Sequence, residues 1–364
     1  MAQEQKGRVL VGMSGGVDSA VCAYLLQRQG YEPTGVNCRF FNNDDAFIRE
    51  KTCCSLEDAA DARAVAYQLG IPFHVFNFTE DFRRSVIEPF VQSYVNGETP
   101  NPCIECNRHL KFDKLLRRAM ELEFDFVATG HYARVSFDNG SGRYLLHKGA
   151  DETKDQSYVL YCLTQQQLSH TLLPLGGMRK SEVREIAQSL GFVNAEKHES
   201  QDICFVPDGD YAAFLERWRG KPFPDGALLD NAGREIGRHR GAVRFTVGQR
   251  RGLGFAAGVR QYVVEKNMRR NTVTLGPESA LYHSALLAAE MNWLSIAEPS
   301  GPIRVTARTR YHQNEHAAAV YPLPGSRAYI LFDEPQRAPT PGQAVVLYDG
   351  ELVLGGGTIA KVEK

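Results

Sequence analysis

The chain has 364 residues, of which 43% are hydrophobic and 23% are charged, and it contains no low-complexity tract. This length predicts two or three domains of an ordinary globular protein. The polar residues 1–8 lack the apolar stretch of a signal peptide, and no later run approaches the roughly 20 apolar residues that span a bilayer. We therefore expect a cytoplasmic protein without a membrane partner, in which eight cysteines do not predict a disulfide framework.

The charge is distributed unevenly. The net charge is −1, but residues 231–310 hold thirteen Lys or Arg against five Asp or Glu, so this segment is +8 and the remainder is −9. A local basic excess of this kind is typical of phosphate-binding surfaces. An ordinary solvated basic face explains it equally well.

Strand-like and amphipathic helical runs alternate through residues 8–150. Strands are predicted at 8–13, 33–40, 73–78 and 126–129, and helices at 19–29, 55–70, 80–96 and 111–122. Alternation of this kind predicts a parallel sheet with right-handed crossovers. Helical patterns at 156–163 and 180–190 extend this α/β domain to about residue 206.

The pattern changes after Pro207. Short strand-like runs separated by glycines occupy 242–247, 261–266 and 272–275, and a third block at 303–308, 317–321, 328–332, 344–348 and 351–359 has the spacing of a small barrel. The predicted plan is an α/β catalytic domain over 1–206, a small, mainly β module over 207–280, and a C-terminal β-barrel over 281–364.

The sequence GMSGGVDS, residues 12–19, lies between the first predicted strand and the first predicted helix. Its glycines allow a tight turn that aims N–H groups into a concavity, and the helix adds its positive N-terminal end, so the loop suits a phosphate or pyrophosphate. Asp18 is a poor neighbour for phosphate unless a cation offsets it, which indicates Mg²⁺. The Lys-Ser/Thr ending of a Walker loop is missing, which disfavours γ-phosphate transfer.

This loop resembles the PP-loop of the ATP pyrophosphatases, α/β proteins that cleave ATP between the α- and β-phosphates and adenylate a substrate oxygen. Further motifs follow: TPNPCIECN at 99–107, KF at 111–112, ATGHY at 128–132, KDQSY at 154–158 and SQDICF at 200–205. In order and spacing they resemble the bacterial tRNA-specific 2-thiouridylases of the MnmA type, over nearly the whole chain.

The resemblance implies ATP-dependent 2-thiolation of the wobble uridine of tRNA, with sulfur delivered by an upstream donor or relay protein. It implies that Cys204 carries the sulfur as a persulfide, and that Cys106 either frees that sulfur as a nucleophile or resolves the spent Cys204 as a disulfide. A mobile loop is expected to bring the two together. The implied ATP contacts are Gly12, Met13, Ser14, Gly15, Gly16, Val17, Asp18, Ser19, Cys38 and Gly130. The implied tRNA contacts are Asn101, Pro102, Cys103, His131, Lys154, Asp155, Gln156, Arg310, Tyr311 and Gln343.

One departure from the family concerns Cys103, because some relatives carry there an Asp that has been given a general acid/base role. A thiol has a higher intrinsic pKa than a carboxyl group, which makes that role less secure. Cys103, Cys106 and Cys204 together suit an iron–sulfur cluster as an alternative, but a single Cys-x-x-Cys is a weak metal signature, so thiol chemistry without a bound metal is favoured. The adjacent Cys53 and Cys54 are interpreted as structural.

Two other functions compete with this interpretation. A PP-loop ligase or amidotransferase would need an ammonia source or an amino-acid pocket, neither of which is visible, and it would leave the paired cysteines without a purpose. A non-catalytic RNA-binding protein could use the C-terminal modules and the basic, glycine-rich loop at 244–252, which is otherwise an ordinary basic hairpin. The intact PP-loop argues against that reading.

Overall fold

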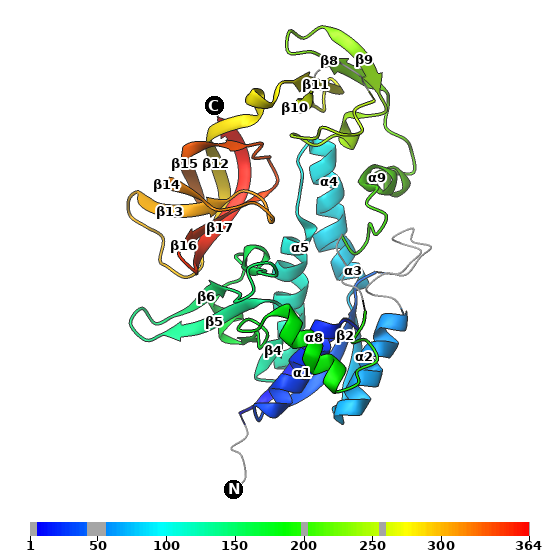
Figure 1. The fold of residues 1–364 in the computed structure, drawn as a ribbon, viewed down its shortest axis with the longest axis vertical. Coiled ribbons are helices and arrows are strands. Elements are labelled where there is room, and N and C mark those ends of the chain that lie inside the picture. Colours follow the sequence, from blue (N-terminus) through cyan, green and yellow to red (C-terminus); the bar gives the residue numbers. More distant parts are fainter. Residues whose placement is uncertain (1–5, 42–55, 198–202, 255–259, 364) are drawn as a thin grey trace.

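The computed structural model describes residues 6–41, 56–197, 203–254 and 260–363 (Figure 1). Cys53, Cys54 and Ser55, the first residue of the helix predicted at 55–70, lie outside these ranges. Within the described part of the chain, no helix combines the length and the apolar character that a membrane crossing requires.

The N-terminal unit is built on a parallel five-stranded sheet in the order β3-β2-β1-β4-β7. Its strands are β1 (Arg8–Gly12), β2 (Glu32–Arg39), β3 (Phe73–Asn77), β4 (Phe126–Ala128) and β7 (Thr171–Leu172). Both faces of β1 are buried, since Val9 and Val11 pack into one core cluster and Leu10 into another. The predicted α/β fold with a parallel sheet is confirmed.

Helices cover both faces of this sheet. The cluster around Val9 includes side chains of α1 (Val17–Arg28), α2 (Leu56–Leu69) and α8 (Lys180–Ser189). The cluster around Leu10 includes side chains of α4 (Glu88–Asn96), α6 (Leu115–Glu121) and α9 (Tyr211–Arg219).

Two of the predicted helices are longer and less regular than their sequence patterns indicate. The helix predicted at 80–96 runs as α3 (Thr79–Phe82), a π-helical turn η1 (Arg83–Ile87) and α4. The helix predicted at 111–122 begins much earlier, as α5 (Pro102–Glu105), the π-helix η2 (Cys106–Lys114) and α6. Asn101 starts this second helix, because its side chain accepts a hydrogen bond from the backbone N–H of Cys103, with Pro102 in the first turn.

Two predicted elements are wrong. The helix expected at 156–163 is only the 3₁₀ turn η3 (Ser157–Val159), and the strand expected at 242–247 is the 3₁₀ turn η4 (Ala242–Arg244). Residues 157–163 are all buried. Their apolar run therefore reflects complete burial rather than one helical face, and periodicity does not distinguish the two. The short helix α7 (Gln165–Ser169) follows.

The central module is a four-stranded sheet in the order β10-β11-β8-β9, drawn at the top of Figure 1. Its strands are β8 (Gly226–Leu229), β9 (Glu235–His239), β10 (Tyr262–Asn267) and β11 (Thr272–Gly276). The 3₁₀ turn η5 (Glu278–Leu281) leads from this module into the barrel.

The C-terminal barrel closes through pairing of its first and last strands, β12 and β17. Its strands are β12 (Tyr282–Trp293), β13 (Ile303–Arg308), β14 (His316–Leu323), β15 (Arg327–Arg337), β16 (Ala344–Asp349) and β17 (Leu352–Glu363). A hairpin of the N-terminal unit, β5 (Ala133–Asp138) and β6 (Arg143–Lys148), adds to the same sheet, because β6 pairs with β17. The sequence analysis did not anticipate this hairpin, which ties the barrel to the loop that follows β4.

Candidate active site

The PP-loop is held by its own backbone and by strand β2. The hydroxyl of Ser19 accepts a hydrogen bond from the backbone N–H of Ser14 (3.2 Å) and donates to the carbonyl of Gly16 (2.9 Å). The buried Asn37 side chain donates to the carbonyl of Met13 (2.9 Å). These bonds fix the loop before any ligand arrives, which suits preorganised binding of an anion.

The N-terminus of α1 can also bind an anion. Gly16 is its N-cap and contributes no capping side chain, so the N–H groups of the first turn can hydrogen-bond an anion. The loop after β4 approaches this terminus closely, because a Cβ added at Gly130 would lie 2.9 Å from the backbone of Asp18. Gly130 is therefore needed for the packing of the loop against α1.

A lysine offsets the charge of Asp18. The ammonium of Lys180, the first residue of α8, lies 2.6 and 2.7 Å from the two carboxylate oxygens of Asp18, and the Tyr132 hydroxyl donates to one of them at 2.7 Å. Lys180 is 8% exposed. Sequence reasoning missed this pair and turned to Mg²⁺ for the cation. The position of Lys180 at the start of a predicted helix gave no signal that it reaches the loop.

Gly15 packs closely against α2. Its φ is +80°, and a Cβ at this position would lie 2.4 Å from the carbonyl oxygen of Asp58 in α2. Its own carbonyl accepts a hydrogen bond from the buried Asn194 (3.0 Å). Gly15 thus faces the supporting helix, and it shapes the loop from behind.

The cysteine motif also differs from expectation, because Cys103 and Cys106 lie on helical backbone rather than on a loop. Cys103 is in α5 and is exposed, whereas Cys106 is the first residue of η2 and is 9% exposed. Cys204 is half-buried.

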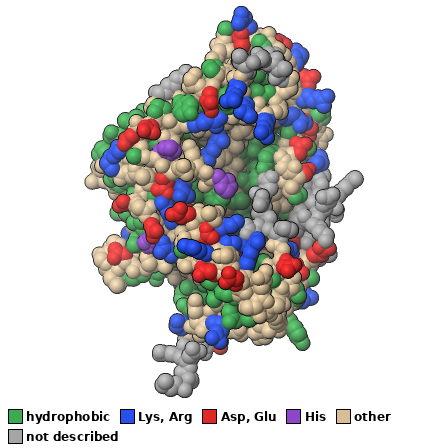
Figure 2. Space-filling model, viewed as in Figure 1, with side chains coloured by type: hydrophobic (Ala, Val, Ile, Leu, Met, Phe, Trp, Pro, Cys, Tyr) green, Lys and Arg blue, Asp and Glu red, His purple; other side chains and the backbone are tan. Residues whose placement is uncertain are grey.

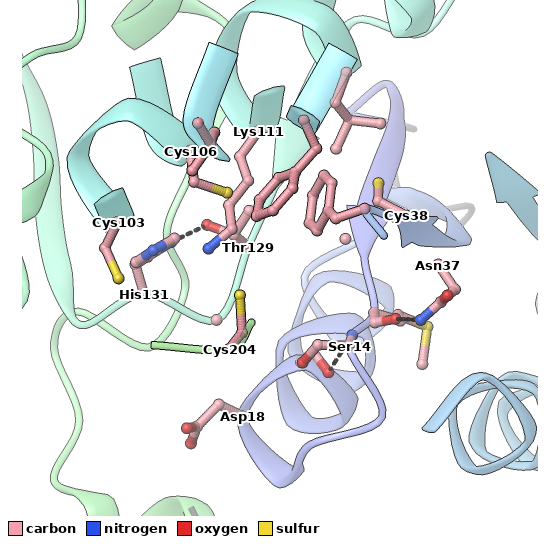
Figure 3. A pocket seen from close by; sticks show the side chains of 18 of the residues that line it. Ser14, Asp18, Asn37, Cys38, Cys103, Cys106, Lys111, Thr129, His131 and Cys204 are labelled. Atoms are coloured by element: carbon pink, nitrogen blue, oxygen red, sulfur yellow. Dashed lines mark hydrogen bonds between the residues drawn. The ribbon is translucent and has the colours of Figure 1, made fainter. Parts of the chain in front are cut away.

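One cavity of about 350 Å³ brings the PP-loop and the cysteines together (Figure 3). Cys103 and Cys106 enter it from the helix, Cys204 from the facing segment, and Asp18 from the first turn of α1. The predicted residues that line it are Gly12, Met13, Ser14, Asp18, Ser19, Cys38, Pro102, Cys103, Cys106, Gly130, His131, Gln156 and Cys204. The predicted residues outside its lining are Gly15, Gly16, Val17, Asn101, Lys154, Asp155, Arg310, Tyr311 and Gln343.

Asp155 lies in a buried charge network. Its carboxylate accepts hydrogen bonds from Gly149, from the backbone and hydroxyl of Ser157, and from Arg308 of β13 at 3.2 Å. The other guanidinium nitrogen of Arg308 contacts Glu315 at 2.9 Å. The network links the barrel to the loop that carries Gln156.

Two other predicted tRNA contacts also join the units. Arg310 donates to the carbonyls of Val247 (3.2 Å) and Ala338 (3.0 Å), so it connects the central module to the barrel. Gln343 donates to the carbonyl of Thr99, two residues before the cap of the cysteine helix. These contacts place both side chains at junctions between the units, and their roles towards tRNA stay predictions. Tyr311 packs near Tyr158, with the ring centroids 5.8 Å apart.

Burial shifts the pKa values of two groups that line the cavity, His131 and Cys38. It lowers the pKa of His131 well below its usual value, with the Lys111 ammonium acting in the same direction, so this imidazole is neutral at pH 7. Its Nδ1 lies 2.7 Å from the Thr129 hydroxyl. Burial, followed by the nearby Cys106, raises the pKa of the Cys38 thiol to about 12. Cys38 therefore lines the cavity as a neutral thiol and does not act as a nucleophile.

Among the described residues, no three His, Cys, Asp or Glu side chains are arranged to hold a metal ion. The three cysteines share a cavity, but in this arrangement they do not form a ligand set.

Comparisons with known proteins agree with the three-part architecture. The family "tRNA methyl transferase HUP domain" matches residues 7–208, "tRNA methyl transferase PRC-barrel domain" matches 212–277, and "Aminomethyltransferase beta-barrel domain" matches 283–359. A parallel HUP-type sheet with a PP-loop at the N-terminus of its first helix defines the chain as a member of the PP-loop superfamily.

The relatives identify the particular family. The chain is 51% identical over 354 residues to the tRNA-specific 2-thiouridylase MnmA of Moorella thermoacetica, which covers 97% of this chain and 99% of the relative. It is 47% identical over 356 residues to the MnmA of Acetivibrio thermocellus, with 97% and 99% covered. The chain belongs to the MnmA family of tRNA-specific 2-thiouridylases.

A solved structure of a 4-thiouridine synthetase–RNA complex with bound ATP is 19% identical, with a TM-score of 0.36, and covers 59% of this chain and 50% of that one. A likeness this distant adds nothing to the assignment.

Proposed function

We propose that this chain thiolates C2 of the wobble uridine of tRNA, by adenylation of the C2 oxygen and sulfur transfer from a persulfide on Cys204. The observation that carries the proposal is the single cavity lined by Ser14, Asp18 and Ser19 of the PP-loop and by the thiols of Cys106 and Cys204. Activation and sulfur transfer both act on the C2 carbonyl of the uracil. The residues that carry out the two steps must therefore line the same cavity.

In the first step the uracil O2 attacks the α-phosphorus of ATP, which enters as its Mg²⁺ complex, and pyrophosphate leaves. The open N-terminus of α1 and the preset Ser14–Ser19 loop bind the departing phosphates. The pairing of Asp18 with Lys180 lowers the local repulsion of these anions. A C2 carbonyl has no good leaving group until AMP is attached to its oxygen.

In the second step the terminal sulfur of the Cys204 persulfide bonds to C2, its proton is lost, and AMP leaves with the former carbonyl oxygen. The Cys106 thiolate then attacks Cys204 Sγ, which expels 2-thiouridine and leaves a Cys106–Cys204 disulfide. In the alternative order, Cys106 first frees hydrosulfide, which then attacks C2. Both routes end in the same disulfide, which a thiol reductant must open before the next turnover.

One face of the molecule suits an anionic polymer. Lys and Arg side chains gather on both sides of a hollow in the face shown in Figure 2. In the basic segment 231–310, Arg240, Arg250, Arg251 and Arg260 are exposed. These side chains can contact tRNA phosphates, each contact releasing a counterion.

The test separates activation from sulfur transfer. Cys106→Ser and Cys204→Ser should each stop 2-thiouridine formation yet retain tRNA-dependent AMP release, and only the Cys106→Ser variant should trap radiolabelled sulfur that dithiothreitol removes. Cys22→Ser, on α1 and outside the cavity lining, is the matched control. Loss of AMP release in both cysteine variants would contradict the division of roles.

The iron–sulfur alternative has its own test. Cys103→Ala should slow the thiol route only partly, but it removes one of three cluster ligands. Full thiolation by enzyme shown to be free of iron would exclude the cluster. Activity only after anaerobic iron–sulfur reconstitution would overturn the persulfide assignment of Cys204.

A further inference from the structure

The helix that carries the cysteine motif has an unusual backbone at the cavity. The π-helix η2 spans Cys106–Lys114, and the backbone N–H of Leu115 bonds to the carbonyl of Leu110, five residues earlier. In an α-helix, residues five apart point about 140° away from each other. The wider π-turn reduces that angle, and Cys106 and Lys111 both line the cavity (Figure 3). Irregular π-segments of this kind are frequent at functional sites.

Lys111 has a distinct place among the titratable groups that face the cavity. These are Asp18 of α1, Cys38 of β2, Cys103 and Cys106 of the cysteine helix, His131 after β4, and Cys204. Asp18 is paired with Lys180, and His131 is neutral. Among the described residues that line the cavity, Lys111 is the only Lys or Arg. Its charge acts to lower the pKa of both Cys38 and His131, and Figure 3 draws the Lys111 side chain beside Cys106.

The remainder of the lining disfavours a thiolate. Phe40, Phe82, Val86 and Leu115 contribute apolar surface to the same cavity, and an apolar surrounding favours the neutral thiol. The thiolate is the form that attacks sulfur. A cavity that needs a nucleophilic cysteine in such surroundings therefore needs a nearby positive charge.

We propose that Lys111 is a positioning and charge-stabilising residue of sulfur transfer, and that the π-helix η2 serves to bring its ammonium beside Cys106. This proposal rests on the thiolation proposed above, and it assigns Lys111 to the second step, sulfur transfer. The Lys111 ammonium favours the thiolate form of Cys106, and it takes no part in adenylation at the PP-loop. No bond to Lys111 forms or breaks.

The direct test measures the ionisation of Cys106 without any turnover. The full-length protein, free of ATP and tRNA, is alkylated with iodoacetamide across a pH series, and mass spectrometry follows the peptide that contains Cys106. In Lys111→Met the rate profile should move to higher pH by about one unit or more. Lys111→Arg should retain the original profile.

Lys114→Gln is the matched control, because it removes a positive charge from the same π-helix. Lys114 does not line the cavity and pairs with Asp81 at 3.0 Å. The pH profile of Cys106 alkylation should be unchanged in the Lys114→Gln variant. If Lys111→Met fails to fold by circular dichroism, Lys111→Gln supplies the same comparison.

A second readout connects ionisation to the reaction. Lys111→Met should lose at least about tenfold in 2-thiouridine formation, in line with the loss of thiolate, and keep tRNA-dependent AMP release. An unchanged alkylation profile in the neutral variants would overturn the role of Lys111, even if the parent enzyme thiolates tRNA. Failure of the parent enzyme to thiolate would instead refute the proposed function and leave the alkylation result standing.

Discussion

The pairing of Lys180 with Asp18 makes a quantitative prediction about ATP binding. Lys180→Met keeps the length of the side chain but removes the ammonium that lies within 2.7 Å of both Asp18 oxygens. The Asp18 carboxylate would then face the incoming phosphates without its partner. The side chains of Lys180 and Asp18 are only 10% and 32% exposed, so solvent replaces the lost charge incompletely.

The expected loss follows from simple electrostatics. Two like unit charges about 4 Å apart repel by about 4 kcal/mol at an effective dielectric constant of about 20. Partial solvation of Asp18 reduces this value, and we expect a loss of about 1.5–3 kcal/mol, comparable to a hydrogen bond to a charged group. ATP should bind about 10- to 150-fold more weakly.

Isothermal titration of Mg–ATP into the protein measures this loss, and a double variant controls it. Asp18→Asn combined with Lys180→Met removes both charges and should recover at least about half of the lost binding free energy, because adjacent sites are not additive. The reasoning is refuted if Lys180→Met binds ATP as the parent does, or if the double variant binds no better than the single one.

Three further predictions concern the loop, the domain junction and the RNA surface. Gly15→Val should lower the melting temperature as well as AMP formation, since its Cβ would lie 2.4 Å from the Asp58 carbonyl; a normal melting temperature would contradict this. Burial opposes ionisation of Glu315, but hydrogen bonds and nearby cations hold its pKa below the usual 4.5. The ionised Glu315 therefore stabilises the fold above pH 4.5, and this stabilisation is lost as the pH falls further. Glu315→Gln should flatten that acid loss of stability in denaturant titrations. Arg250→Glu should weaken tRNA binding and reduce its salt dependence, whereas Arg244, paired with Glu216 at 2.8 Å, should matter less; equal effects in binding isotherms would contradict the distinction.

The α/β sheet could be predicted from sequence because its strands carry continuous apolar runs between amphipathic helices. Strand β1 shows this directly, since Val9, Leu10 and Val11 are all fully buried. The barrel strands β13 and β16 were also predicted within one residue of their observed bounds. For these strands the local sequence pattern is sufficient.

The candidate site was only partly predictable, because its geometry depends on contacts between distant segments. The motif residues identified the loop and the thiols, but not that Lys180 reaches Asp18 across 162 positions. Nor does the sequence show that α2 packs closely against Gly15. Neither does sequence reveal a π-turn, whose widened backbone brings Cys106 and Lys111 into one cavity.

The most direct measurement is the stoichiometry of AMP and 2-thiouridine in one reaction. The protein is incubated with Mg–ATP, a sulfur donor, a thiol reductant and tRNA whose wobble uridine is unmodified, and both products are quantified. The account predicts one AMP for each 2-thiouridine formed, and no AMP when the tRNA already carries the sulfur. Release of ADP and phosphate, or AMP formation that does not depend on tRNA, would contradict it.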